Sequence, residues 1–329
     1  MSGRRDSSWT LSWVGAAAFL LSLFTVYLHL KALGRAYVVD YQIPRHAAML
    51  AGTAGNPWQY RVLSAWIVEG AQRLLAAVGV HDPLIAAFVA VRVVEQTLWF
   101  VVAWLYWRSL GLASAAATLG LALLGWSVSG ANYGSDLQFN TYFDALFYTL
   151  GALAVARDRP LWLLPLTLLA ALNRETSGLL PLLPLAALPE AGPQRTRRVW
   201  IVALGLVIYG IVFVALRIAY GPQELIVPYG HRPGIDLLLY NVGRVRTWGQ
   251  LLATFSILPF LALASYRRWP RVLRGFFWLV VPLWFAVHWV AAVMAETRLL
   301  LVPLTLVILP GALFLLRSEA SQPELVRAG

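Results

Sequence analysis

Apolar runs of about 20 residues recur along the whole 329-residue chain, and they constrain its fold more than any other feature. Such runs are typical of transmembrane helices, because a helix needs about 20 residues to cross the hydrocarbon core of a bilayer. Only 12% of the residues are charged, whereas a soluble domain carries about 25%. The sequence therefore predicts an all-α polytopic membrane protein that forms one integral-membrane domain over residues 1–329.

The first run, LSWVGAAAFLLSLFTVYLHL, is too long for the apolar core of a signal peptide, and no small-residue cleavage site follows it. We interpret it as a retained span. The length of the chain leaves room for about ten membrane helices. The expected spans lie at 11–33, 84–107, 112–130, 141–156, 160–172, 177–189, 199–219, 248–266, 276–295 and 298–316.

The net charge of +11 would suggest nucleic acid as the partner of a soluble protein. Here the arginines cluster in short loops between apolar runs, which is the pattern of loops on the cytoplasmic side of a membrane. We therefore expect a lipid bilayer and no nucleic acid as partner, with both termini cytoplasmic. The longer loops on the opposite side are 34–83, 131–140 and 220–247. The first of them contains candidate surface helices at about 44–51 and 58–78.

Two short hairpins are predicted, with the motifs NRET and AETR at their tips. The arms of the first, 160–172 and 177–189, have only about 13 residues each, or roughly 20 Å of helix. The core of a bilayer is about 30 Å thick, so this hairpin is expected to be short or re-entrant. The two tips place four charged residues on the outer face: Arg174, Glu175, Glu296 and Arg298.

These four charges have two interpretations, because charged groups within a membrane are paired or line a water-filled cavity. They can pair with one another as interfacial anchors, or they can line an outward polar cavity whose arginines bind an anionic headgroup. The deeper Arg92 and Glu95 are three residues apart and favour a structural ion pair. His288, a lone histidine among aromatic residues, favours a satisfied core group.

Polar residues in the outer loops are further candidates. Asn132, Asp136 and Gln138 fit either a hydrophilic turn or a site that recognises sugar hydroxyls. Arg244 and Arg246 are external arginines that the topology does not require, so they indicate either a solvated loop or a phosphate site. The histidines show no ligand spacing and cysteine is absent, so we expect no metal site and no cofactor.

The order of these features resembles the GT-C superfamily of integral-membrane glycosyltransferases, and most of all its bacterial mannosyltransferase-type members. The resemblance rests on an early aspartate after the first span, the turn GTAGNPWQYR, the hairpin LAALNRETSGLLPLLPL and the late segment ETRLLLVPLTLVILP. It implies a bacterial inner-membrane enzyme that transfers a sugar from a polyprenyl-phosphate donor to a glycan, lipid or protein acceptor on the extracytoplasmic face.

The resemblance also implies roles for individual residues. Asp40 matches the aspartate that acts as general base in this family, and no second acidic residue stands beside it, which favours a metal-independent enzyme. Glu175 and Glu296 would contact substrate together with Asn132, Asp136 and Gln138. The lipid phosphate would be held first by Arg174 and Arg298, and second by Arg61, Arg244 and Arg246.

Two other classes of protein remain open. A transporter or lipid flippase would place its coupling sites near the midplane of the membrane and show inverted repeats. A non-catalytic scaffold subunit would not need its polar residues to converge. The enzyme hypothesis, in contrast, requires Asp40, Arg174 and Arg298 to line one outward cavity.

Overall fold

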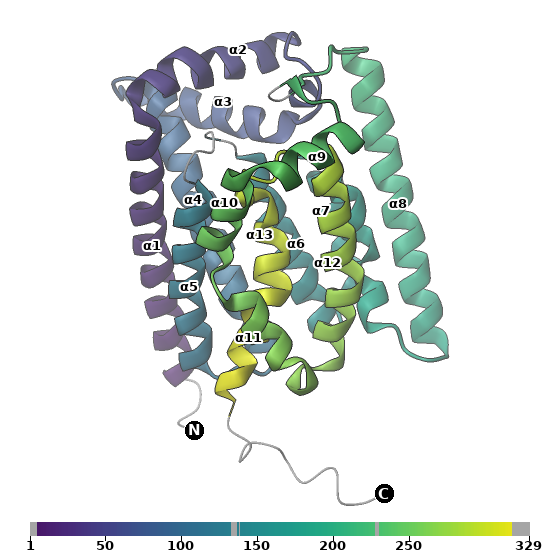
Figure 1. Cartoon of the computed structure of the whole chain (residues 1–329). Helices are drawn as coiled ribbons and strands as arrows, with labels where there is room; N and C mark the ends of the chain where they lie inside the picture. Colours follow the sequence, from purple (N-terminus) through teal and green to yellow (C-terminus); the bar gives the residue numbers. More distant parts are fainter. Residues whose placement is uncertain (1–4, 133–136, 138, 228–229, 318–329) are drawn as a thin grey trace, which may run out of the picture.

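A computed structural model describes residues 5–132, 137, 139–227 and 230–317, and all of the regular elements in this part of the chain are helical (Figure 1). One isolated bridge joins Asn56 to Leu225. The α-helices of the first half are α1 (Arg5–Tyr37), α2 (Ile43–Ala51), α3 (Val62–Ala77), α4 (Pro83–Ser109), α5 (Ser114–Asn132) and α6 (Asn140–Ala156). The all-α prediction is confirmed.

The second half of the chain alternates long α-helices with short or irregular ones. Its α-helices are α7 (Leu163–Ala171), α8 (Pro193–Tyr220), α9 (Ile235–Gly243), α10 (Val245–Phe255), α11 (Leu258–Ala264), α12 (Arg271–Ala291), α13 (Leu301–Pro303) and α14 (Leu309–Leu313). The 3₁₀ segments that the structure describes are η2 (Trp58–Tyr60), η3 (Pro160–Trp162), η4 (Glu175–Ala187), η6 (Tyr266–Arg268), η7 (Thr297–Leu300) and η9 (Phe314–Leu316). The π-helical segments are η1 (Val38–Gln42) and η8 (Leu304–Ile308).

The C-terminal segment Thr297–Leu316 forms the centre of the bundle. Its most apolar window is 89% buried, whereas that of α8 is only 22% buried. A helix that is apolar all round can face either protein or lipid. The buried fractions of the two segments show which of them faces protein. The C-terminal segment packs inside the protein, and α8 presents most of its apolar surface outward, as expected for a helix in contact with lipid.

Within the described residues, six helices are long and apolar enough to cross a membrane, or seven if the bent pair α10 and α11 forms one broken span. These helices indicate an integral membrane protein. The number is lower than the predicted ten for identifiable reasons. The predicted span 160–172 contains a helix of only nine residues, and 177–189 is a 3₁₀ segment with Pro181 and Pro184 inside it. A proline cannot donate a backbone hydrogen bond, so an α-helix is not sustained there.

Two further predicted spans also differ. The span 141–156 corresponds to α6, which has 17 residues and is almost entirely buried. The span 248–266 is bent by 59° between α10 and α11. Both segments contribute to the bundle, but neither meets the length expected of a straight transmembrane helix. The short hairpin predicted around NRET agrees with the short α7 and η4.

The first predicted outer loop, 34–83, contains the two expected helices. They are α2 and α3, and both lie across one end of the bundle (Figure 1). Helix α9, from the other long loop, lies at the same end, whereas α1 begins and η9 ends at the opposite end (Figure 1). Trp66 and Leu74 of α3 are 51% and 73% exposed, which fits a helix on a membrane surface.

The contact between α12 and η4 leaves no room for a side chain at Gly275, where an added Cβ would collide with the backbone carbonyl of Ala186. We expect Gly275→Ala to lower the free energy of unfolding by about 1–3 kcal/mol, because overpacking forces backbone shifts. The measurement is thermal unfolding in detergent, followed by tryptophan fluorescence. Gly210→Ala is the control, because a Cβ at this helical position meets nothing within 4 Å. Equal melting temperatures for the two variants would contradict the packing.

Candidate functional site

A cavity of about 370 Å³ lies between five segments that are distant in the sequence. They are the turn after α2, the tip of the NRET hairpin, the segment between α8 and α9, the end of α12 and the start of the C-terminal segment. Its volume is within the range of small-molecule sites. The lining residues are Asn56, Pro57, Trp58, Arg61, Arg174, Glu175, Thr176, Leu225, Ile226, Pro233, Val287, His288, Ala291, Ala292, Val293, Glu296, Arg298 and Leu299.

The turn at Asn56 is fixed to the segment before α9 by backbone hydrogen bonds. The Asn56 amide donates to the Glu224 carbonyl at 2.8 Å, and the Ile226 amide donates to the Asn56 carbonyl at 2.9 Å. Gly55 permits this approach, because a Cβ there would lie 2.8 Å from a side-chain carbon of Ile226. The two long loops thus join to form one wall of the cavity.

Three buried arginines reach the cavity, and each is paired with a carboxylate from another position. Arg61 donates two hydrogen bonds to Glu175 Oε2, at 2.7 and 3.1 Å. Arg298 donates to Glu296 at 2.5 Å. Arg174 lies 3.7 Å from Asp144, which comes from α6 beneath the cavity. The cavity wall itself carries three arginines and two glutamates, and the third carboxylate, Asp144, lies beneath it. Positive charge is therefore concentrated at the cavity surface, which favours an anionic ligand.

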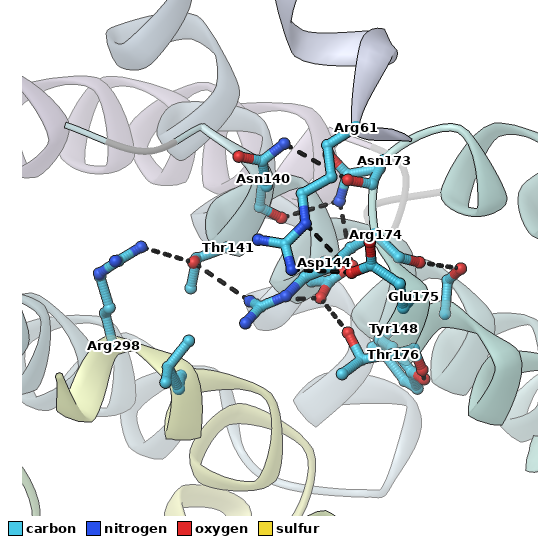
Figure 2. A network of polar contacts seen from close by, with 12 residues as sticks. Arg61, Asn140, Thr141, Asp144, Tyr148, Asn173, Arg174, Glu175, Thr176 and Arg298 are labelled. Carbon is cyan, nitrogen blue, oxygen red and sulfur yellow. Dashed lines mark hydrogen bonds and ion pairs between the residues drawn. The ribbon is translucent and has the colours of Figure 1, made fainter. Parts of the chain in front are cut away.

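Thr141 holds two of these arginines close together. Its Oγ1 accepts one hydrogen bond from Arg174 at 3.3 Å and another from Arg298 at 3.0 Å (Figure 2). Two guanidinium groups on one hydroxyl repel each other strongly in a buried site. Thr141 also lies in the first turn of α6, where the helix dipole adds positive potential. An anion bound here would relieve this repulsion.

The NRET tip is fixed from below by the carboxylate of Asp144, which is 1% exposed. Asp144 accepts hydrogen bonds from Asn173 at 3.0 Å and from Thr176 at 2.7 Å (Figure 2). Asn173 also donates to the Asn140 carbonyl at 2.8 Å. Because residues on both sides of Arg174 are held in this way, its guanidinium is a rigid part of the site rather than a mobile surface charge.

The charges at the tip shift the pKa values of both its ionisable residues. Burial, together with the nearby Arg61, lowers the pKa of Arg174 to about 10, so this residue stays cationic at neutral pH. Burial raises the pKa of Glu175, but the charge and hydrogen bonds of Arg61 outweigh burial, and the net pKa is below the ordinary value of 4.5. Glu175 is therefore an anion that is difficult to protonate.

This depressed pKa makes stability depend on pH. The contribution of Glu175 is present above its unfolded-state pKa of 4.5 and is lost as the pH falls through the lower pKa of the folded state. We expect the melting temperature of the wild type to fall below about pH 4.5 more steeply than that of Glu175→Gln. Unfolding in detergent at a series of pH values measures this. Parallel curves for the two proteins would contradict the pairing with Arg61.

Several predicted site residues lie elsewhere. Asp40 is exposed in the π-helical turn η1 and does not line the cavity. Arg244 contacts the Tyr240 side chain, Arg246 is exposed, and neither lines the cavity. Asn132 is buried and accepts a hydrogen bond from the Tyr142 hydroxyl. The predicted residues Asp136 and Gln138 lie outside the described residues.

Each interpretation of the hairpin tips agrees with part of the structure. Arg298 pairs with Glu296, as the first interpretation predicts, and Arg174 and Arg298 line one cavity, as the second predicts. The predicted pairing of Arg92 with Glu95 is confirmed, because their charged atoms are 3.5 Å apart and both side chains are buried. His288 is buried as predicted, but it lines the cavity and its Nε2 has no partner among the described residues. It is therefore more than a satisfied core group.

Sequence reasoning did not identify Thr141 and Asn173 as site residues. Thr141 belongs to NTYFDALF, in which Asn140, Thr141 and Asp144 fall on adjacent turns of a helix that is otherwise apolar. The spacing of these three polar residues could have identified Thr141 as a site residue. Within the described residues, no group of three or more His, Asp or Glu side chains is arranged to hold a metal ion.

Comparisons with known proteins add no assignment. No family model matches this chain, and no significant match was found to a curated protein or to a solved structure.

Proposed function

We propose that this protein is a membrane-embedded glycosyltransferase of the GT-C type that takes a sugar from a polyprenyl phosphate. The acceptor is a glycan, lipid or protein on the extracytoplasmic face of a bacterial inner membrane. The observation that carries the proposal is the convergence of Arg61, Arg174 and Arg298 on one cavity. Guanidinium groups bind phosphate through two parallel hydrogen bonds. A phosphate that is joined to a lipid is held at the membrane, where a cavity of a membrane protein can bind it.

The rest of the cavity wall supports a ligand that is partly apolar. Leu225, Ile226, Val287, Ala291 and Leu299 line the same space as the arginines. A free inorganic anion would gain nothing from such a surface, whereas a prenyl chain would be stabilised by leaving water. The combination of a cationic group of side chains and an apolar wall therefore favours a lipid phosphate.

In the proposed reaction, the bond between the anomeric carbon of the sugar and the phosphate oxygen breaks as an acceptor hydroxyl attacks that carbon. Negative charge then builds up on the leaving phosphate, where Arg174 and Arg298 stabilise it. Glu175 and Glu296 each have one oxygen held by an arginine and are 28% exposed, so they can also accept hydrogen bonds from sugar hydroxyls.

The geometry gives no support to Asp40 as the general base. The enzyme hypothesis required Asp40 to line the same cavity as Arg174 and Arg298, and only the two arginines do so. In the described arrangement Asp40 faces solvent or lipid from the turn that joins α1 to α2. The proposal therefore keeps the role predicted for the arginines and leaves Asp40 outside it.

The test is transfer by the purified protein in lipid nanodiscs, with a panel of polyprenyl-phosphate sugars as donors and water or added saccharides as acceptors. We expect release of polyprenyl phosphate from at least one donor, and loss of this release in Arg298→Gln. Arg246→Gln is the matched control, because Arg246 is exposed and lies outside the cavity. A folded wild-type protein that neither binds nor turns over any donor would refute the proposal.

A further inference from the structure

His288 lies in the wall of the cavity, yet the phosphate-binding role does not use it. It belongs to the last turn of α12 and is 2% exposed. Its ring stacks on the indole of Trp284, with 4.8 Å between the ring centres. Trp284 is fixed in turn, because its Nε1 donates to the Leu299 carbonyl at 2.7 Å. The imidazole is therefore held rigidly beside the arginines.

The contacts of the ring determine which nitrogen carries the proton. His288 Nδ1 lies 2.8 Å from the backbone carbonyl of Trp284. A carbonyl oxygen can only accept a hydrogen bond, so Nδ1 is the protonated nitrogen, and Nε2 of the neutral ring carries a lone pair. A second proton on Nε2 would add a fourth positive charge to a cavity that already contains three arginines.

The Nε2 atom is buried and has no hydrogen-bond partner among the described residues. A buried acceptor without a partner is costly, so such atoms in proteins are usually satisfied by a ligand or by water. The partner that suits an unprotonated imidazole nitrogen is a hydroxyl group. Phosphate oxygens at neutral pH are mainly acceptors and would go to the arginines instead.

The other basic groups of the cavity are carboxylates that are already bonded to arginines. One oxygen of Glu175 accepts two hydrogen bonds from Arg61. Glu296 is bound by Arg298 at 2.5 Å. A carboxylate paired with an arginine is a weak base. Glu175 Oε1 also has no hydrogen-bond partner among the described residues, but its carboxylate is bonded to Arg61 through the other oxygen. His288 is the basic residue of the cavity wall with no described hydrogen bond to an arginine.

We infer that His288 is the general base of this site and binds the acceptor hydroxyl through Nε2. The inference rests on the proposed function. As the acceptor oxygen forms its bond to the anomeric carbon, the hydroxyl proton moves to Nε2 and the bond from the anomeric carbon to the phosphate oxygen breaks. The electron pair of that bond leaves with the polyprenyl phosphate, which the arginines hold.

Two variants test the role of Nε2. His288→Asn can keep a donor near the Trp284 carbonyl but has no counterpart of Nε2, and His288→Gln has an amide that can bind a hydroxyl but cannot take its proton. We expect both to bind a polyprenyl-phosphate hexose within threefold of the wild type and to transfer the sugar at least 100-fold more slowly, since general bases contribute about 10²–10⁴-fold. Transfer by either variant at the wild-type rate would overturn the inference.

A second measurement does not depend on turnover. Nitrogen-15 NMR of histidine-labelled protein in nanodiscs reports the tautomer of each of the five histidines, and the His288→Gln spectrum assigns the signal of His288. We expect a neutral ring protonated on Nδ1, and a proton on Nε2 at neutral pH would overturn the inference. If the wild type transfers sugar but the variants do too, only the inference fails. If the wild type binds and transfers nothing, the proposed function fails and the inference fails with it.

Discussion

Replacement of Arg298 by glutamine is expected to weaken the binding of polyprenyl phosphate by about 100-fold. Arg298 is 1% exposed and is held by Glu296 and Thr141 at the edge of the cavity. Hydrogen bonds to charged groups contribute about 1.5–3 kcal/mol each, and about 1.4 kcal/mol corresponds to a factor of ten in affinity. Two such bonds to one phosphate account for the expected loss. The measurement is a titration of short-chain polyprenyl phosphate into protein in nanodiscs.

The controls for this prediction separate charge from fold. Arg298→Lys keeps the charge but loses the forked geometry, so it should bind with intermediate affinity. Arg246→Gln removes an exposed arginine outside the cavity and should bind like the wild type. Equal affinity of Arg298→Gln and the wild type, with an unchanged melting temperature, would show that the phosphate does not bind here.

Asp144→Ala is expected to cause the largest loss of stability. Its carboxylate is buried, accepts hydrogen bonds from Asn173 and Thr176, and faces the buried Arg174. Removal of one partner of a buried pair leaves the other charge uncompensated, which costs about 3–5 kcal/mol. We expect the melting temperature in detergent to fall by roughly 10 °C, on the general scale that relates free energy to melting temperature.

An exposed ion pair provides the control for Asp144→Ala. Glu190 lies 3.7 Å from Arg271, and both side chains are largely exposed. Such pairs contribute little, because water and salt screen them. Glu190→Ala should therefore leave the melting temperature almost unchanged. If Asp144→Ala and Glu190→Ala had the same melting temperature, the network beneath the NRET tip would not stabilise the fold.

The two hairpin tips were predictable because a charged residue between apolar runs costs free energy in a membrane, so its presence indicates a structural or functional role. NRET and AETR stand out in the sequence, and the structure brings Arg174 and Arg298 to one cavity. The pairs between near neighbours in sequence, Arg92 with Glu95 and Arg298 with Glu296, were predictable, and the others were not. Arg174 pairs with Asp144 rather than with its neighbour Glu175, and Glu175 pairs with Arg61, more than 100 residues away in sequence. Local spacing carries no information about such contacts.

Hydropathy predicts more spans than the six or seven sufficiently long helices of the described residues, because it does not report backbone hydrogen bonding. Pro181 and Pro184 convert an apolar arm into a 3₁₀ segment. The apolar stretch at 248–266 bends near Ser256, which has a positive φ of 48°. The exposure of Asp40 also depends on a local irregularity, since the chain continues from α1 through a π-helical turn. A loop residue was expected there.

Arg174 and Arg298 are proposed to hold the phosphate of a polyprenyl-phosphate ligand. Cryo-electron microscopy of the protein in nanodiscs with bound polyprenyl phosphate, and with an antibody fragment to add mass, would locate that phosphate. We expect phosphate density within hydrogen-bond distance of both guanidinium groups, beside Thr141. Phosphate density at another place, with the arginines still paired to Asp144 and Glu296, would contradict it.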